Sequence, residues 1–217
     1  MSRRITGHRR PSTPASSGCS ATFATRGRST TRSRERRRPS GLDVLLHAAG
    51  LWQPGIPGQI TGEDIDLLVD TNLRATIFTN QAAYSVMRKD GGGRIINFGS
   101  GEAVMGSPIS ALYAATKGAV SAWTRSVARA WAAEKISAIA LAPAVQTPGA
   151  DRLREFLGPA AAEFIDQEIK KTIPLGGALG DPVDDLGPTL VFLCSEGSRF
   201  ITGQLIAIDG GLVMLGA

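Results

Sequence analysis

The sequence predicts an α/β protein with a doubly wound parallel sheet, in which helices cover both faces of the strands. The order of strand-like and helix-like segments along the chain predicts this fold. Short apolar runs that end in small residues, such as LDVLLHAAG at 42–50, alternate with long segments of helical periodicity. No run reaches the roughly 18 apolar residues that a membrane span needs. The length of 217 residues suits one domain, or one domain and an arm.

Charge divides the chain into two parts. Residues 1–42 hold eleven arginines and one acidic residue, Glu35, which gives +10, whereas the remaining 175 residues hold 13 basic and 18 acidic residues, which gives −5. We therefore expect a basic, low-complexity arm over 1–42, disordered by itself because it has too few apolar residues to offset its ordering entropy. A folded α/β domain is predicted over 43–217.

Three interpretations of the arm stay open. It is a solvated basic tail that binds phosphates weakly, a transit peptide, or a replacement for a normal segment. A specific nucleic-acid function is disfavoured because the body is acidic and has no aromatic stacking platform.

The body contains the elements of alternating strand–helix units. Apolar runs predict strands at 42–50, 93–100, 136–144 and 203–211. Helical spacing predicts helices at 61–89, 110–134 and 183–195. Residues 148–182, rich in Pro and Gly, interrupt the pattern after a strand, where a doubly wound sheet binds its substrate.

Tyr113 and Lys117 form the first candidate for chemistry. They lie four residues apart in a predicted helix and so share one face. We expect the ammonium to lower the phenol pKa and to make the pair a proton donor and acceptor. The alternative is a half-exposed tyrosine beside a solvated lysine.

Two polar residues strengthen this hypothesis. Ser100 follows the second strand. Its hydroxyl can donate a hydrogen bond to the substrate oxygen with which Tyr113 would exchange a proton. Asn72 lies inside a predicted helix, where asparagine is not preferred, and a water chain to Lys117 would satisfy a buried amide there. Asn72 as a solvated helix residue is the alternative.

Over 43–217 the chain resembles the short-chain dehydrogenases/reductases. The similar segments are HAAG (47–50), GRIINFGS, YAATKGAV, APAVQTP and ITGQLIAIDGG, with Asn72, Ser100, Tyr113 and Lys117 at the family's order and spacing. The resemblance implies a Rossmann-like fold and hydride transfer between a secondary alcohol and a ketone, with NAD or NADP. It assigns Tyr113 as acid/base, Ser100 to the carbonyl, Lys117 to the nicotinamide ribose and Asn72 to a proton relay.

The resemblance also implies cofactor contacts from three small residues after the first strand and from two residues near 145. These are Ala48, Ala49, Gly50, Pro143 and Thr147, besides Lys117. His47 departs from the family's asparagine, and we interpret it as a packed strand residue. The turn after Pro143 is one residue short, and no metal site is predicted.

The largest departure lies upstream. The family begins with a strand, a glycine-rich turn and a helix, and the turn holds the pyrophosphate. Here ITG (5–7) resembles that strand's end, but Pro11 and Thr13 stand where glycines are required. We expect the first strands to be missing, the 42–50 strand to be an unpaired edge, and dinucleotide to bind weakly. A deletion or a shifted frame is favoured over an alternative start.

Partners and location are predicted last. Cys19 and Cys194 form no disulfide framework, which favours a reducing cytoplasm. No membrane association is expected. The small-molecule alcohol or ketone should be apolar, because apolar side chains gather in 148–175: Leu153, Phe156, Leu157 and Phe164. The long helices, with Trp123 and Trp131, suggest a homodimer or homotetramer, unless the tryptophans belong to the core.

Overall fold

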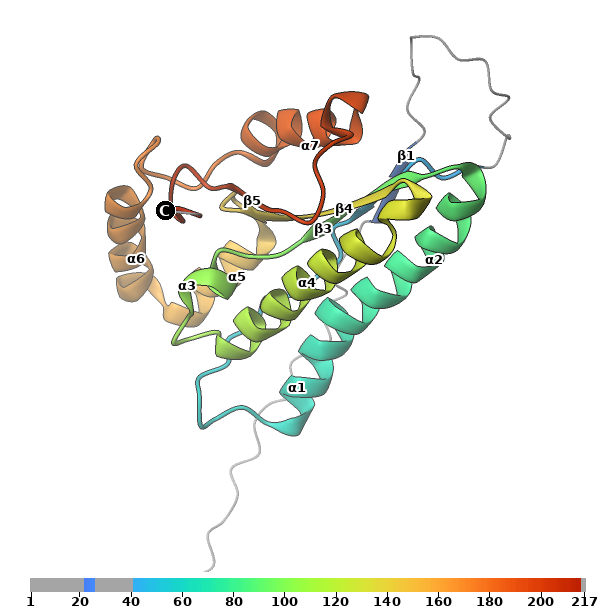
Figure 1. Ribbon diagram of the computed structural model, residues 1–217. Helices are drawn as coiled ribbons and strands as arrows, with labels where there is room; N and C mark the ends of the chain where they lie inside the picture. The colour runs from blue at the N-terminus through green and yellow to red at the C-terminus, as the bar shows by residue number, and fades with distance from the viewer. Residues whose placement is uncertain (1–21, 26–40, 216–217) are drawn as a thin grey trace, which may run out of the picture.

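The computed structural model describes residues 22–25 and 41–215, which build one five-stranded sheet flanked by helices (Figure 1). The strands lie in the order β1-β2-β3-β4-β5. Their bounds are Thr22–Thr25, Val44–His47, Gly93–Phe98, Ile136–Pro143 and Leu205–Ile208. Strands β2 to β5 are parallel, as the doubly wound α/β prediction requires.

The central strands are apolar because both of their faces are covered. Ile95 and Ile96 in β3 and Ile139 in β4 have no exposed surface. Ile96 is in register with Leu46 on one side and with Ile139 on the other. This burial explains why these strands appear in the sequence as continuous apolar runs and not as alternating ones.

The expectation that the 42–50 strand would be an unpaired edge is wrong. β1 pairs with β2 in the antiparallel direction, from Thr22 opposite His47 to Thr25 opposite Val44. The segment TFAT has the β-branched and aromatic residues that favour a strand, and its backbone satisfies the groups that β2 would otherwise leave open. Our prediction of disorder for the rest of the arm lies outside the described residues, and the domain boundary at residue 42 stays a prediction.

One face of the sheet carries two long helical segments (Figure 1). The first runs without a break through α1 (Gly62–Leu68), the π-helical η1 (Val69–Arg74) and α2 (Ala75–Asp90). A capping box between Thr61 and Asp64 starts it, and Gly91, with φ of 93°, ends it. The second is α4 (Ala111–Ala130), followed by the short η2 (Ala132–Glu134). Both helices match the predicted segments.

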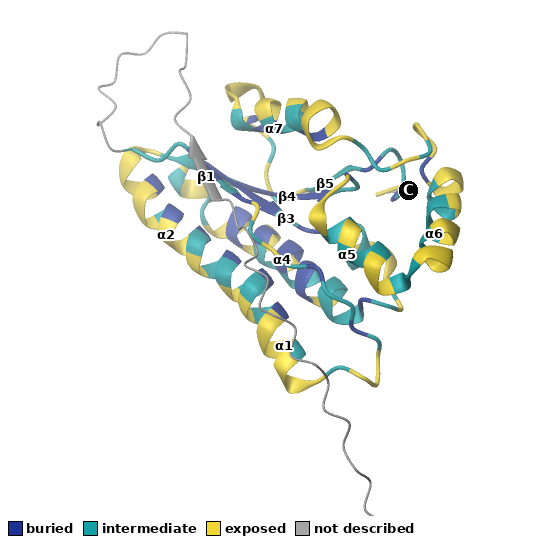
Figure 2. Cartoon of the chain, turned by 180° about the vertical axis from the view of Figure 1, so that it is seen from behind, coloured by how far each residue is buried: buried dark blue, intermediate teal, exposed yellow. Residues whose placement is uncertain are grey.

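Apolar side chains fill both interfaces of the sheet, and the buried faces of α2 and α4 point toward the strands (Figure 2). Met87 and Val127 pack there against Leu45 and Ile95. On the opposite face, η3 (Pro182–Leu186), α7 (Gly187–Cys194) and η4 (Glu196–Ser198) follow one another. Leu186 and Leu193 of this group pack onto β3 and β4.

The segment that interrupts the pattern is helical. It forms α5 (Pro148–Leu157) and α6 (Pro159–Thr172), and neither helix contains a buried residue (Figure 2). The short α3 (Glu102–Met105) follows β3. Among the residues described here, no helix has both the length and the apolar character to cross a membrane.

Candidate active site

The predicted catalytic side chains meet at the carboxyl edge of the sheet. Ser100 comes two residues after β3, and α4 brings Tyr113 back over this edge. The Ser100 side chain lies close enough to Tyr113 to lower the pKa of its phenol. The ammonium nitrogen of Lys117 lies 5.8 Å from the centre of the Tyr113 ring. The parallel strand and the following helix therefore position three of the four predicted groups together.

Lys117 is a buried cation, with 5% of its surface exposed. Its Nζ donates a hydrogen bond of 2.9 Å to the carbonyl oxygen of Phe98, the last residue of β3. Burial lowers its pKa from 10.5 to about 8. The bland interpretation of a solvated lysine is therefore wrong.

Tyr113 corrects our expectation about acidity. Burial and the nearby Glu102 carboxylate raise the phenol pKa to about 12, and the Ser100 side chain opposes them. The expected lowering by Lys117 does not prevail, because desolvation disfavours the phenolate and the neighbouring carboxylate repels it. At neutral pH the phenol is protonated and can act as a hydrogen-bond or proton donor.

Asn72 lies in η1 with no exposed surface, so its solvated alternative is wrong. Its Oδ1 accepts from the backbone N–H of Leu51 at 2.7 Å, and its Nδ2 donates to the carbonyl of Leu51 at 2.9 Å and to Thr116 Oγ1 at 3.1 Å. A Cβ at Gly50 would lie 3.1 Å from Lys117 Nζ and 3.4 Å from Asn72 Oδ1. Gly50 thus lies between the amide and the ammonium.

The residues assigned to the cofactor by resemblance also lie along this edge. Ala48, Ala49 and Gly50 follow β2 directly, and Ala48 and Gly50 are exposed. Pro143 ends β4, and exposed Thr147 caps α5 by accepting from the N–H of Ala150 at 3.4 Å. Small exposed residues leave room for a ribose to approach the backbone, which fits a dinucleotide here.

His47 is buried, with 2% of its surface exposed, as the interpretation as a packed strand residue requires. Its Nδ1 contacts Thr79 Oγ1 at 3.1 Å. The Thr79 hydroxyl already donates toward backbone carbonyls, to Ala75 at 2.9 Å. Nδ1 must therefore carry the proton that it gives to Thr79, and Nε2 is left without a hydrogen-bond partner among the described residues. Burial, and then Lys117, lower the pKa of the imidazole.

Sequence reasoning missed Glu102. Its backbone N–H donates to Ser100 Oγ at 3.1 Å, and its carboxylate accepts a short hydrogen bond from Ser110 Oγ. An acidic residue two positions after a candidate catalytic serine was the available signal. The carboxylate is a second charged group at the site, besides Lys117.

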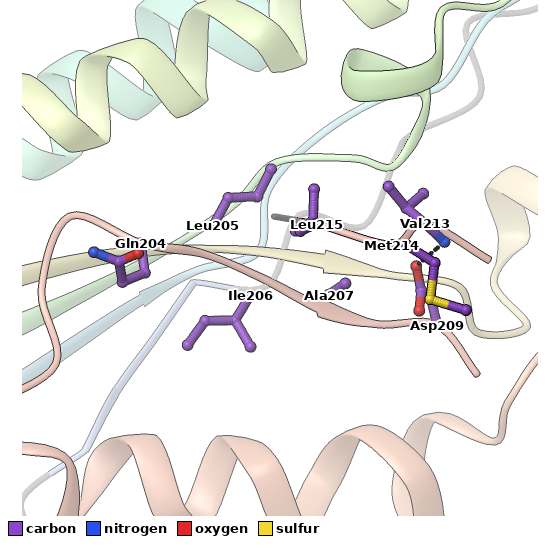
Figure 3. Close-up of a pocket in the computed structure, with 8 residues that line it drawn as sticks. All are labelled: Gln204, Leu205, Ile206, Ala207, Asp209, Val213, Met214 and Leu215. Carbon is purple, nitrogen blue, oxygen red and sulfur yellow. Dashed lines mark hydrogen bonds between the residues drawn. The ribbon is translucent and has the colours of Figure 1, made fainter. Parts of the chain in front are cut away.

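A hollow of about 620 Å³ runs along β5 and the segment that follows it (Figure 3). Leu205 and Ile206 point to opposite sides of the strand in this view, and Asp209 Oδ2 accepts from the N–H of Val213 at 2.8 Å. None of the predicted catalytic residues lines this hollow. The cluster of Ser100, Tyr113 and Lys117, and not this hollow, is therefore the candidate reactive site.

Comparisons with known proteins agree with this geometry. Residues 28–213 match the family described as enoyl-(acyl carrier protein) reductase. A tropinone reductase homolog from Arabidopsis thaliana is 33% identical over 179 residues, which cover 81% of this chain and 63% of that protein.

Two solved structures resemble the chain. A protein from Sinorhizobium meliloti that is assigned as a short-chain alcohol dehydrogenase has a TM-score of 0.72 and 32% identity, covering 79% of this chain and 66% of that one. A variant of ElxO with NADPH bound has a TM-score of 0.68 and 31% identity, covering 79% and 67%. The chain thus spans about two thirds of the length of the proteins that it matches. It belongs to the short-chain dehydrogenase/reductase family, whose members are NAD(P)-dependent oxidoreductases.

Proposed function

We propose that the chain transfers hydride between a secondary alcohol and a ketone, with NAD or NADP as the cofactor. The observation that supports this proposal best is that Ser100 and Lys117 both lie beside Tyr113, with the lysine on the same helix face. A protonated phenol and a hydroxyl that meet at one point can both donate to a single carbonyl oxygen. The substrate oxygen would sit where they converge.

In ketone reduction the nicotinamide supplies the hydride to the carbonyl carbon when it is bound. Tyr113 gives its proton to the carbonyl oxygen as negative charge develops there, and Ser100 holds that oxygen. The Lys117 ammonium, pinned to the Phe98 carbonyl, stabilises the phenolate left behind. Asn72 holds the backbone of Leu51 next to Lys117 through two hydrogen bonds. We assign Asn72 to the proton relay that leads away from Lys117. In alcohol oxidation each proton moves the other way.

The cofactor would bind at the carboxyl edge, through the backbone at Ala48 to Gly50 and near Pro143 and Thr147. The NADPH in the ElxO structure supports this class of cofactor. The test is oxidation of NADH and of NADPH against a panel of ketones. The chain should turn over at least one ketone, and Tyr113→Phe should lower the rate by roughly 10²–10⁴-fold while the fold is unchanged by circular dichroism. Unchanged turnover by Tyr113→Phe would refute the acid role.

An impaired relative is the second candidate. Residues 1–42 contain no glycine-rich turn, and β1 runs antiparallel to β2. Both observations favour weak dinucleotide binding, because the usual pyrophosphate anchor is a glycine turn at a helix N-terminus. Fluorescence titration with NADPH separates the candidates. Affinity typical of an intact dehydrogenase would exclude impairment.

The substrate proposed from the sequence is apolar. Phe156 on α5 and Phe164 on α6 are 47% and 63% exposed, on the helices that follow β4. Leu153 and Leu157, which lie on α5 with Phe156, are half-buried. An apolar substrate that binds at the carboxyl edge of the sheet would cover these exposed aromatic rings.

A homo-oligomer is proposed through the outer faces of the long helices. Trp131 stacks on Tyr84 with ring centres 4.5 Å apart, and both tryptophans pack against the core. These tryptophans therefore do not support an interface between copies of the chain. The support comes from exposed apolar residues of α1 and α2, namely Ile65, Leu67, Phe78 and Val86. Light scattering should give a dimer or tetramer that Phe78→Glu weakens. A monomeric parent protein would refute the oligomer.

A cytoplasmic location is a separate prediction, and fractionation of cells would test it.

A further inference from the structure

Glu102 brings a carboxylate to the pair that holds the substrate oxygen. It begins α3, two residues after Ser100, and its own N–H donates to Ser100 Oγ at 3.1 Å. The carboxylate lies close enough to Tyr113 to be the second largest cause of its raised pKa. Backbone and charge therefore both place Glu102 at the reacting groups.

One oxygen of this carboxylate is engaged. Oε2 accepts from Ser110 Oγ, and Ser110 Oγ in turn lies 2.6 Å from Ser107 Oγ, whose hydroxyl can donate to it. This contact fixes the side chain against the start of α4, because Ser110 is the residue before that helix and has no exposed surface. Glu102 as a residue is half-buried.

The charge is not neutralised within the described part of the chain, where Glu102 has no ion-pair partner. Lys117, the other charged group of the site, gives its hydrogen bond to the Phe98 carbonyl. A partly desolvated carboxylate without a counter-ion gains when a ligand brings a cation. It would also disfavour anionic substrates at the same point.

Building on the proposed function, we propose that Glu102 selects substrates that carry a cationic nitrogen close to the reacting carbon. The substrate class is then an amino ketone and the matching amino alcohol, with an apolar remainder. The alternative role for Glu102 is purely structural: it would hold Ser110 and the start of α4 and ignore substrate charge.

Two ketones of equal shape separate these roles. In 1,1-dimethyl-4-oxopiperidinium a quaternary nitrogen replaces the substituted carbon of 4,4-dimethylcyclohexanone, and its charge does not change with pH. We expect the wild-type chain to have the higher kcat/KM for the charged ketone. Glu102→Gln should lower the ratio of the two kcat/KM values by about fivefold, the size of effect expected from an ion pair at the upper end of the range for partly exposed pairs.

The variants are chosen so that effects on folding, and effects of the nitrogen on the reactivity of the carbonyl, do not change the ratio of the two kcat/KM values. A glutamine can still accept from Ser110, so α4 should start as before. The inductive effect of the nitrogen on the carbonyl is the same for every variant, so only the change in the ratio counts. Glu102→Asp should keep most of the preference. Glu63→Gln, on an exposed residue of α1, should leave the ratio unchanged.

A binding measurement keeps this inference separate from the proposed function. Calorimetric titration of the purified chain with the two corresponding alcohols should show tighter binding of the charged one, and the difference should vanish in Glu102→Gln. If neither ketone is reduced but this difference is found, the proposed reaction is wrong and the charge selection stands. If the ratio and the affinity difference are the same in wild type and Glu102→Gln, Glu102 is structural and the inference is overturned.

Discussion

The Nζ of Lys117 donates a 2.9 Å hydrogen bond to the carbonyl oxygen of Phe98, at the point where β3 ends and the segment to Ser100 begins. This bond ties the helix that carries Tyr113 to the strand that delivers the serine. It also holds an ammonium in a site with 5% exposure, which is costly for a charge. Positioning is thus obtained at the expense of stability, as is common at functional sites.

Lys117→Met should therefore stabilise the protein while removing activity. At pH 7 the buried amine must stay protonated against a pKa lowered to about 8, a difference worth about 3 kcal/mol. The substitution also leaves the Phe98 carbonyl without its hydrogen bond, which costs about 1–2 kcal/mol and offsets part of this gain in stability. We expect a net gain of roughly 1–2 kcal/mol in the free energy of unfolding, measured by urea denaturation.

The pH dependence checks the cause. Between pH 8 and 10.5 the unfolded chain binds more protons at this lysine than the folded one, so the wild-type protein gains stability there as pH rises. The advantage of Lys117→Met should shrink over the same interval. Lys89→Met, at an exposed position of α2, should show neither effect. A less stable Lys117→Met at every pH would contradict the argument.

Gly50→Ala should disturb the lysine without changing its chemistry. The added Cβ would lie 3.1 Å from Lys117 Nζ and 3.4 Å from Asn72 Oδ1, so the ammonium must shift. Because small displacements of positioned groups are costly in catalysis, we expect kcat to fall by roughly 10–100-fold. Gly62→Ala is the matched control, since nothing lies within 4 Å of its Cβ. Equal rates for both variants would mean that Gly50 does not set the position of Nζ.

His47 should make the protein sensitive to acid. Its folded-state pKa is lowered from 6.5, so its stabilising neutral form is kept above pH 6.5 and is lost as the pH falls below it. His47→Asn removes this titration. Below pH 6.5 the wild type should lose stability relative to His47→Asn by up to about 1.4 kcal/mol per pH unit. Thermal unfolding between pH 5 and 8 measures it, and parallel curves for the two proteins would show that His47 does not titrate on unfolding.

The sequence predicted the elements that depend on local pattern. Apolar runs located β3 and β4, and helical periodicity located α4, so the four-residue spacing of Tyr113 and Lys117 predicted a shared face. The acidity of Tyr113 was predicted with the wrong sign. Its pKa depends on burial and on Glu102, which are properties of the packed structure and not of spacing.

Pairing partners were also beyond the sequence. TFAT is a four-residue segment inside a basic, Ser-rich region, and only the open edge of β2 gives it a partner. In the same way, Asn72 could be predicted as buried or solvated until its bonds to the Leu51 backbone were known. Long-range contacts decide such residues, and periodicity carries no information about them.

A buried amide pair behind the active site gives the last prediction. Asn80 on α2 and Asn97 on β3 exchange two hydrogen bonds, of 2.9 and 2.8 Å. Asn97 also donates to Thr124 Oγ1 at 3.0 Å, and Trp123 Nε1 donates to Asn80 Oδ1 at 3.0 Å. Neither amide has exposed surface. The pair therefore joins α2, β3 and α4 by polar contacts that water cannot replace.

Asn80→Leu should cost about 2–4 kcal/mol of unfolding free energy, because Asn97 Oδ1 and the Trp123 N–H lose their partners and Asn97 Nδ2 keeps only Thr124. Asn97→Leu should cost a similar amount. The double variant should cost clearly less than the sum, since each single change already breaks both mutual bonds. Urea denaturation of the four proteins gives the coupling energy. Strict additivity would mean that the two amides stabilise the fold independently, and that the pair is not the unit that holds α2 to β3.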